Sequence, residues 1–157
     1  MNLEEHRKLY IGKIAKGVSD DFMERLFKCC GTVLSWRRST DAGGELKAFG
    51  FVEFESVEAV FACLKILNNM NLFDSKLMVK ANEKTMSFLN DWKDLKKMEW
   101  VSVKERAGET IDTEDLEVKE SMGELMPYEK ELIPDYDRIL TDIERTINNK
   151  DIIEQVA

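Results

Sequence analysis

The run Lys47–Phe54, with the sequence KAFGFVEF, holds the side chains with the most distinctive chemistry in this chain. Side chains alternate along an extended strand, so Lys47, Phe49 and Phe51 would share one face. The other face, which includes Val52, is suited to packing on helices. Rings on the exposed face of a sheet form an apolar patch of the kind that marks a contact surface. They suit unstacked nucleobases, because each base stacked on an aromatic ring contributes about 1–3 kcal/mol to binding.

A second segment of this kind is Leu9–Ile14 (LYIGKI). It alternates as a short strand, with Tyr10 on one face and Leu9 and Ile11 on the other. The position of Tyr10 relative to the phenylalanines depends on how the remaining segments arrange the two strands.

The remaining segments follow a regular order. Ser19 and Ser56 have the chemistry of helix N-caps and precede runs with apolar residues at helical spacing. Thr32–Arg38 is β-branched and aromatic enough for a strand, and Leu77–Ala81 predicts the last strand, with Lys80 facing outward.

The resulting order, βαββαβ over residues 8–82, predicts an α+β fold. Right-handed crossovers lead to a four-stranded antiparallel sheet with both helices on one face and the other face open. The first and third strands are central neighbours in that topology. We therefore expect Tyr10 to lie beside Phe49 and Phe51 on the uncovered face.

The two strand segments resemble the signature motifs of the RNA recognition motif (RRM), which has a ferredoxin-like sandwich fold. Leu9–Ile14 resembles its RNP-2 hexamer, and Lys47–Phe54 resembles its RNP-1 octamer at seven of eight positions. Ala48 stands where the octamer usually has Gly. Lys13 stands where the hexamer usually has Asn, which adds a cation beside the sheet. The resemblance implies a protein that binds single-stranded RNA on its open sheet.

A narrower resemblance covers about residues 8–98. The runs that are similar to the RNA-binding protein 25 family of splicing regulators are Cys30–Arg38, Lys47–Phe51, Leu77–Lys80 and Thr85–Lys93. This resemblance implies a nuclear factor that is associated with the U1 small nuclear ribonucleoprotein and influences splice-site choice in pre-mRNA. Family members usually continue into an Arg/Glu-rich region and a C-terminal PWI fold. Neither is present in these 157 residues, which predicts a fragment of a longer protein or a divergent short one.

Three segments follow the predicted domain. Residues 83–100 predict a helix with Leu95 on its apolar face, which would either lie across the open sheet or pack at its edge. Residues 101–127 are acidic and weakly periodic, which predicts a solvated linker. An alternative for this stretch is autoinhibition, in which its carboxylates imitate RNA phosphates. Residues 128–150 predict an amphipathic helix that begins at Pro134 and docks on the domain, a second copy or a partner protein.

The charge is unevenly distributed. Residues 1–100 hold 16 Lys and Arg against 15 Asp and Glu, whereas residues 101–157 hold 7 against 16. Any contact with phosphate must therefore come from the local placement of cations and not from the overall field.

Composition also narrows the class of protein. No apolar run is long enough to span a membrane and the N-terminus is polar, so we expect a soluble intracellular protein without membrane contact. Cys29, Cys30 and Cys63 lack metal-ligand spacing and predict buried, reduced thiols. The single histidine, His6, lies in a charged N-terminal tail. We therefore expect no metal site, no cofactor and no enzyme activity.

The candidate site follows from these assignments. We predict base stacking on the three rings and phosphate contacts from four cations, with Arg37 as a further candidate; the rings are Tyr10, Phe49 and Phe51, and the cations are Lys13, Arg38, Lys47 and Lys80.

Two nearby residues and one rival function stay open. Trp36 fits either the core or a base contact, because a bulge in its strand would change its face. Glu53 points outward and could accept a hydrogen bond from a base amino group. The alternative function is a protein-interaction module of the same fold, whose sheet or helices bind another splicing protein.

Overall fold

A computed structural model describes residues 3–149 of the chain. The strands are β1 (Lys8–Gly12), β2 (Val33–Thr40), β3 (Leu46–Phe54), β4 (Asn71–Leu72), β5 (Ser75–Lys76) and β6 (Met78–Lys80). The helices are the 3-10 helix η1 (Leu3–His6) and the α-helices α1 (Asp20–Cys30), α2 (Val57–Leu67), α3 (Glu83–Arg106), α4 (Thr113–Ser121), α5 (Pro127–Glu131) and α6 (Tyr136–Ile147).

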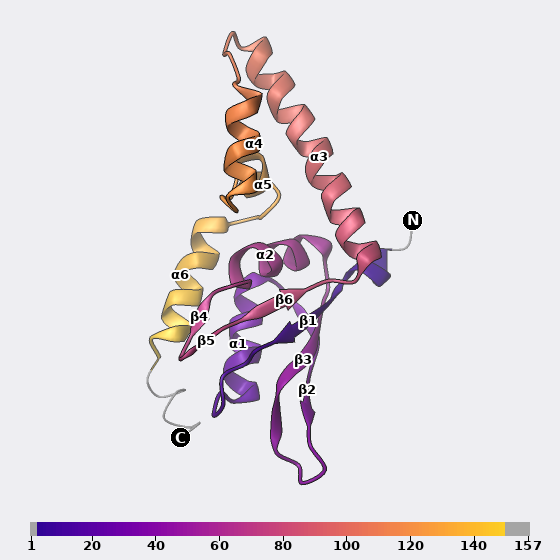
Figure 1. Cartoon of the computed structure of the whole chain (residues 1–157), viewed down its shortest axis with the longest axis vertical. Coiled ribbons are helices and arrows are strands. Elements are labelled where there is room, and N and C mark those ends of the chain that lie inside the picture. The colour runs from indigo at the N-terminus through magenta and orange to yellow at the C-terminus, as the bar shows by residue number, and fades with distance from the viewer. Residues whose placement is uncertain (1–2, 150–157) are drawn as a thin grey trace.

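Four of the strands form one antiparallel sheet in the order β2-β3-β1-β6. Helices α1 and α2 lie on one face of this sheet (Figure 1). A short ribbon of β4 and β5 connects α2 to β6. The predicted α+β fold, with βαββαβ order, a central β1–β3 pair and a helix after the last strand of the sheet, is confirmed.

Local chemistry explains where the two covering helices begin. The Ser19 hydroxyl accepts a hydrogen bond from the Phe22 amide at 3.1 Å, and the Ser56 hydroxyl accepts one from the Ala59 amide at 3.2 Å. Each serine satisfies an amide that has no partner within the helix, and Asp20 and Asp21 add favourable charge at the positive end of α1.

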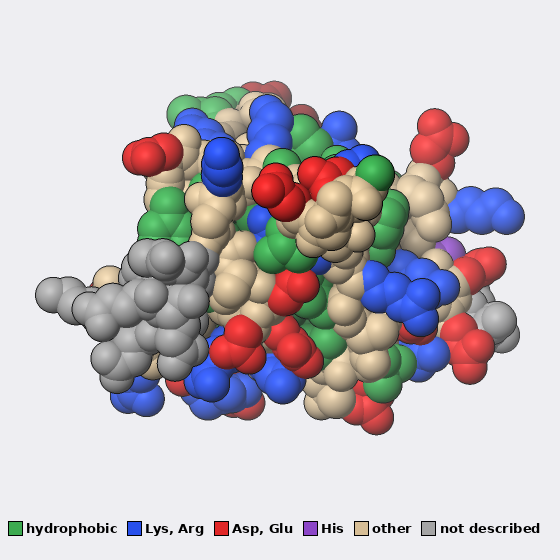
Figure 2. All heavy atoms as spheres, turned by 90° about the horizontal axis from the view of Figure 1, so that it is seen from below, with side chains coloured by type: hydrophobic (Ala, Val, Ile, Leu, Met, Phe, Trp, Pro, Cys, Tyr) green, Lys and Arg blue, Asp and Glu red, His purple; other side chains and the backbone are tan. Residues whose placement is uncertain are grey.

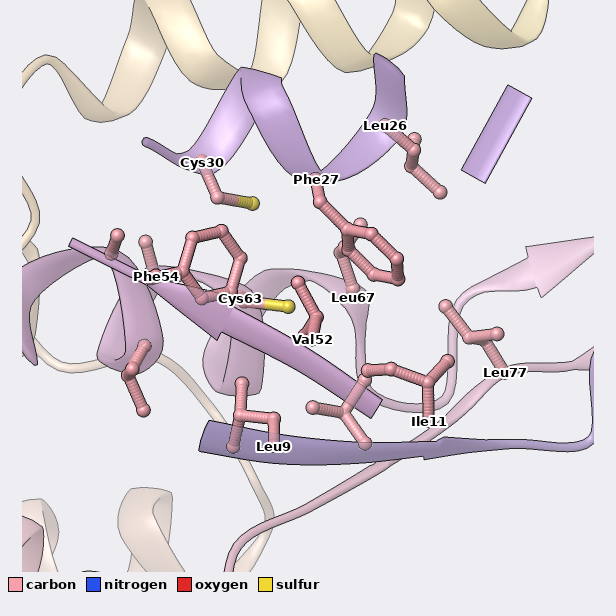
Figure 3. Packing of buried hydrophobic residues seen from close by; sticks show 14 of the residues in the cluster. Leu9, Ile11, Leu26, Phe27, Cys30, Val52, Phe54, Cys63, Leu67 and Leu77 are labelled. Carbon is pink, nitrogen blue, oxygen red and sulfur yellow. The ribbon is translucent and has the colours of Figure 1, made fainter. Parts of the chain in front are cut away.

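The core lies between these helices and the inner face of the sheet. Figure 3 shows side chains from both layers meeting there: Leu9, Ile11, Leu26, Phe27, Cys30, Val52, Phe54, Cys63, Leu67 and Leu77. All three cysteines are free thiols; Cys30 and Cys63 are buried, and Cys29 is half-buried. Burial raises the pKa of the Cys63 thiol well above its usual range, so this thiol is protonated and unreactive.

Helix α3 differs from its prediction in length and in packing. It continues past Trp100 to Arg106 and projects away from the sheet (Figure 1). Near its start, Trp92 packs edge-on against Phe61 of α2, with ring centroids 5.6 Å apart. Leu95, predicted on the packed face, is 66% exposed because the helix has by then left the domain.

The N-terminal segment is ordered against α3, which corrects the expectation of a charged tail. The ring of His6 is buried and stacks on Phe88 at 4.5 Å between centroids. Its Nδ1 lies 3.0 Å from the hydroxyl of Thr85. η1 therefore anchors the first turns of α3.

The acidic stretch predicted as a linker contains α4, which folds back along α3 (Figure 1). Leu116, Met126 and Tyr128 form a second small core together with Trp100. Glu129 of α5 joins this arm to the domain through an ion pair with Lys65 of α2, with 2.7 Å between Oε2 and Nζ. The sequence did not predict α4, because Leu116 is its one buried side chain and a single apolar position gives no helical periodicity. The division of the chain into four domains and segments stays a prediction.

Helix α6 begins at Tyr136, with Asp135 as its N-cap residue, and not at Pro134. Ile139 and Ile143 are buried against the domain, where α6 packs on α1. Of the three predicted docking partners, the structure shows the domain itself. The last predicted position of this helix, residue 150, lies outside the described residues.

Candidate functional site

The strand register places one row of side chains across the open face of the sheet. Tyr10 of β1 is paired with Phe51 of β3. Lys80 of β6 is paired with Tyr10, and Arg37 of β2 is paired with Phe51. Directly opposed residues have Cβ atoms about 4.5–5.5 Å apart, so the row is a continuous surface of cation, ring, ring and cation.

The three predicted rings are brought together. The centroid of Tyr10 lies 5.9 Å from that of Phe49 and 5.6 Å from that of Phe51. Phe51 is 53% exposed, and Tyr10 and Phe49 are half-buried. Gly12 leaves space for Tyr10, because a Cβ at that position would lie 2.8 Å from the tyrosine ring.

The helices outside the core do not cover this face. α3 packs on η1 and α5 and projects away from the sheet, and α6 packs on α1, which covers the opposite face of the sheet. The aromatic row therefore remains open to a flat ligand.

Three of the four predicted cations are free to meet an anion. Lys13, Lys47 and Lys80 are exposed, and none of them forms an ion pair with a described residue. The Nζ of Lys47 lies 6.0 Å from the centroid of Phe49, beside the rings. Lys13 has a positive φ of 56° at the end of β1, and its carbonyl accepts a hydrogen bond from the Ser75 hydroxyl at 2.7 Å.

Arg38 is not free, which corrects its predicted role. Its side chain is 2% exposed, and its guanidinium donates to the carbonyls of Lys47 (2.8 Å) and Val18. It also pairs with Asp20 at 3.8 Å. Burial lowers the pKa of Arg38, and the Asp20 carboxylate opposes that shift. The geometry gives Arg38 a structural role on the helix side of the sheet.

A β-bulge in β2 explains why Arg37, and not Arg38, points to the open face of the sheet. The register shifts between Val33 and Ser35, where one extra residue enters the strand. Trp36 consequently turns inward, with its ring 4.9 Å from that of Phe27, and Arg37 turns outward. The open question about Trp36 is thus answered in favour of the core.

Sequence reasoning missed two residues of the open face, Lys8 and Ser35. Both are paired with Glu53, from the strands on either side of β3. Lys8 could have been found, because it precedes Tyr10 by two positions and so shares its face. Ser35 could not, since its face depends on the bulge.

Charged side chains of both signs are mixed on the face of the molecule that Figure 2 shows. Seen from below in Figure 2, Lys and Arg side chains form small groups that alternate with Asp and Glu, and no continuous basic field is visible. Among residues 3–149, no group of His, Cys, Asp and Glu is arranged to hold a metal ion. No helix within the same residues is both long and apolar enough to cross a bilayer.

Comparison with known proteins agrees with this fold. The RNA recognition motif family model matches residues 9–78. RNA-binding protein 25 of Mus musculus and of Homo sapiens is 38% identical over 89 residues, which is 57% of this chain and 11% of the relative. The U1 snRNP-associated protein usp107 of Schizosaccharomyces pombe is 41% identical over 63 residues, or 40% of this chain and 9% of the relative.

A solved structure of the RNA15 RRM is 23% identical, with a TM-score of 0.47, and covers 52% of this chain and 95% of its own. The matched region spans about a tenth of the length of these curated relatives. The βαββαβ topology and the two strand motifs agree with the match of the RNA recognition motif family model to residues 9–78.

Proposed function

We propose that this chain binds single-stranded RNA on the open face of its sheet. The observation that carries the proposal is the open row of Tyr10 and Phe51 between Lys80 and Arg37, two cations that form no ion pair with a described residue. Bases stack on the rings, and the cations neutralise phosphates of the same strand. Such a surface tolerates any base at the stacked positions, because every base has a π-face.

Replacing Phe49 and Phe51 together by Ala tests the proposal. Each substitution is expected to lower the binding free energy for a short single-stranded RNA by about 1–3 kcal/mol, because each removes a stacking surface. Fluorescence anisotropy with a labelled oligomer measures the affinity. Phe73→Ala is the matched control, since Phe73 is an exposed ring on the turn between β4 and β5 that contacts Phe22 of α1, on the helix side of the sheet.

An unchanged affinity in the double variant, with the same urea midpoint as the parent, would remove RNA stacking from the account. The alternative then gains support: a protein-interaction module whose sheet binds another splicing protein. Salt provides a second distinction, because phosphate contacts make log affinity fall with log salt by about 0.7 per contact for a single strand.

We also propose a nuclear role in pre-mRNA splicing, with pre-mRNA and splicing-factor proteins as partners. The support is the names of two relatives, RNA-binding protein 25 and a U1 snRNP-associated protein, and the length of the match to the first of them. The match to RNA-binding protein 25 covers 89 residues, more than the residues 9–78 of the family match. It therefore includes residues outside that matched range.

Recovery of small nuclear RNAs with the tagged full chain tests this role. We expect U1 RNA to be enriched over the other spliceosomal RNAs in a nuclear extract. The Phe49→Ala and Phe51→Ala double variant shows how the chain associates with U1 RNA. If the double variant no longer recovers U1 RNA, the association depends on RNA binding; if it still does, the association depends on protein contacts. A parent chain that recovers U1 RNA no better than the other spliceosomal RNAs would contradict the splicing proposal and leave RNA binding intact.

A further inference from the structure

The open face holds a hollow of about 410 Å³ next to the stacking rings. Phe51 and Val52 line part of it, and Lys8, Ser35, Arg37 and Glu53 line the rest. The hollow lies at the row in which Lys8 and Ser35 pair with Glu53, next to the row that contains Tyr10 and Phe51. A nucleotide adjacent to the base stacked on Phe51 therefore reaches it. The volume is sufficient for a nucleobase.

The charged groups of this hollow form no ion pair within the part of the chain that the structure describes. Glu53 is half-buried, and its carboxylate makes no hydrogen bond or ion pair with any described residue. Lys8 and Arg37 are likewise unpaired among residues 3–149. The carboxylate is therefore available to accept hydrogen bonds from a ligand, and the two cations are available to donate to an acceptor of the same ligand.

The required ligand pattern follows from the chemistry of these side chains. A carboxylate offers two adjacent acceptors, whereas Lys and Arg offer only donors. The complement is a base edge with two adjacent donors and one acceptor beside them. Guanine has this pattern on its Watson–Crick edge: the N1–H and the N2 amino group donate, and O6 accepts.

The other bases do not fit. Cytosine and adenine each place an acceptor nitrogen next to their amino group, which a carboxylate repels. Uracil has one N–H between two carbonyls, so it cannot supply both acceptors of Glu53. In single-stranded RNA the Watson–Crick edge is free to be read in this way.

We propose that the hollow is a guanine-selective subsite, in which Glu53 accepts hydrogen bonds from N1–H and N2–H and Arg37 or Lys8 donates to O6. The base lies beside the nucleotide stacked on Phe51, with Ser35 at the wall formed by β2. This inference rests on the proposed RNA binding and adds the base that the sheet selects.

RNA oligomers with one changed nucleotide test the subsite. A single guanosine is moved along a short uridine oligomer, and the affinity of the full chain is measured at each position. At one position we expect guanosine to bind about tenfold more tightly than adenosine, cytidine or uridine, as for a bidentate contact to a base. Inosine, which lacks the N2 amino group, should lose most of this gain, and 7-deazaguanosine, which keeps the Watson–Crick edge, should retain it.

Glu53→Gln is the matching protein variant, because Gln keeps the size of the side chain and exchanges one acceptor for a donor. It should remove the preference for guanosine and leave the affinity for the uridine oligomer within about twofold, since stacking is sequence-tolerant. Glu55→Gln is the control: it makes the same change in charge at an exposed position just beyond β3 that does not line the hollow.

The outcomes separate the two proposals. An affinity for guanosine that matches that of the other bases, or a preference that survives Glu53→Gln, overturns the guanine subsite while RNA binding stands. A preference that 7-deazaguanosine abolishes also overturns it, because the protein then reads N7. Failure of every oligomer to bind the parent chain at low salt overturns the proposed RNA binding itself.

Discussion

Arg37 and Arg38 are neighbours in sequence and have different environments. Arg37 faces the open sheet opposite Phe51, whereas the guanidinium of Arg38 ties β2 to β3 and to the start of α1. Gly50, opposite Arg38, allows this close approach: a Cβ there would lie 2.5 Å from the Arg37 carbonyl oxygen. At the scale of single residues, one position along a strand decides whether an arginine faces the open sheet or holds the domain together.

Alanine substitution of the two arginines should give opposite results. Arg37→Ala should weaken RNA binding and reduce the slope of log affinity against log salt by about 0.7, with unchanged stability, because it removes one phosphate contact. Arg38→Ala should leave the slope unchanged and lower the free energy of unfolding by about 2 kcal/mol, since hydrogen bonds to a charged group are lost. Urea unfolding and salt-dependent anisotropy measure both quantities. Equal effects of the two substitutions on the slope would contradict the assignment.

At the scale of elements, the structure adds a third layer that the βαββαβ order does not require. α6 lies on the outer side of α1, so α1 is covered on two sides. The Cys29 thiol and the Thr146 hydroxyl, 3.5 Å apart, mark this contact. The pKa of Cys29 is raised by its partial burial there. α6 therefore contributes to the stability of the domain from the side away from the rings.

Two substitutions on α6 test this contribution. Ile143 is 3% exposed, whereas Leu140 on the same helix is 38% exposed. Ile143→Ala should lower the free energy of unfolding by about 2–5 kcal/mol, as for a buried aliphatic residue. Leu140→Ala should change it by about 0.5 kcal/mol. RNA affinity should be the same for both variants at a temperature where both are folded. Similar destabilisation by the two would show that α6 does not dock on α1.

For the whole molecule, the question is how an acidic chain keeps its acidic groups away from the proposed RNA-binding face. The acidic segment is held in the arm formed by α3, α4 and α5, where carboxylates pair with lysines of α3. Lys97 lies 3.3 Å from Glu120, and Lys104 lies 3.6 Å from Glu109. Charges further than about 8 Å apart are largely screened at physiological salt, so these carboxylates act within the arm. The geometry does not favour the autoinhibitory alternative, which needs the acids beside the cations of the sheet.

The strand alternation and the serine caps were readable from sequence because both are set by residues within a few positions of each other. They predicted the sheet, its two covering helices and the meeting of Tyr10 with Phe49 and Phe51. Because β1 and β3 are neighbours in this topology and side chains alternate along each strand, the position of the three rings on the open face could be predicted from the topology. The two segments that resemble RNP-1 and RNP-2 predicted the RNA recognition motif family, and the fold and the family match to residues 9–78 agree with that prediction.

The tertiary structure alone decided which charges are available. The bulge after Val33 exchanged the faces of Arg37 and Arg38, and pairing across three strands brought Lys8, Glu53 and Ser35 around one hollow. The packing of α3, α4 and α6 also depends on contacts between residues far apart in the chain. Periodicity within a segment reports which face is apolar, but not what covers it, so these features appear only once the chain is folded.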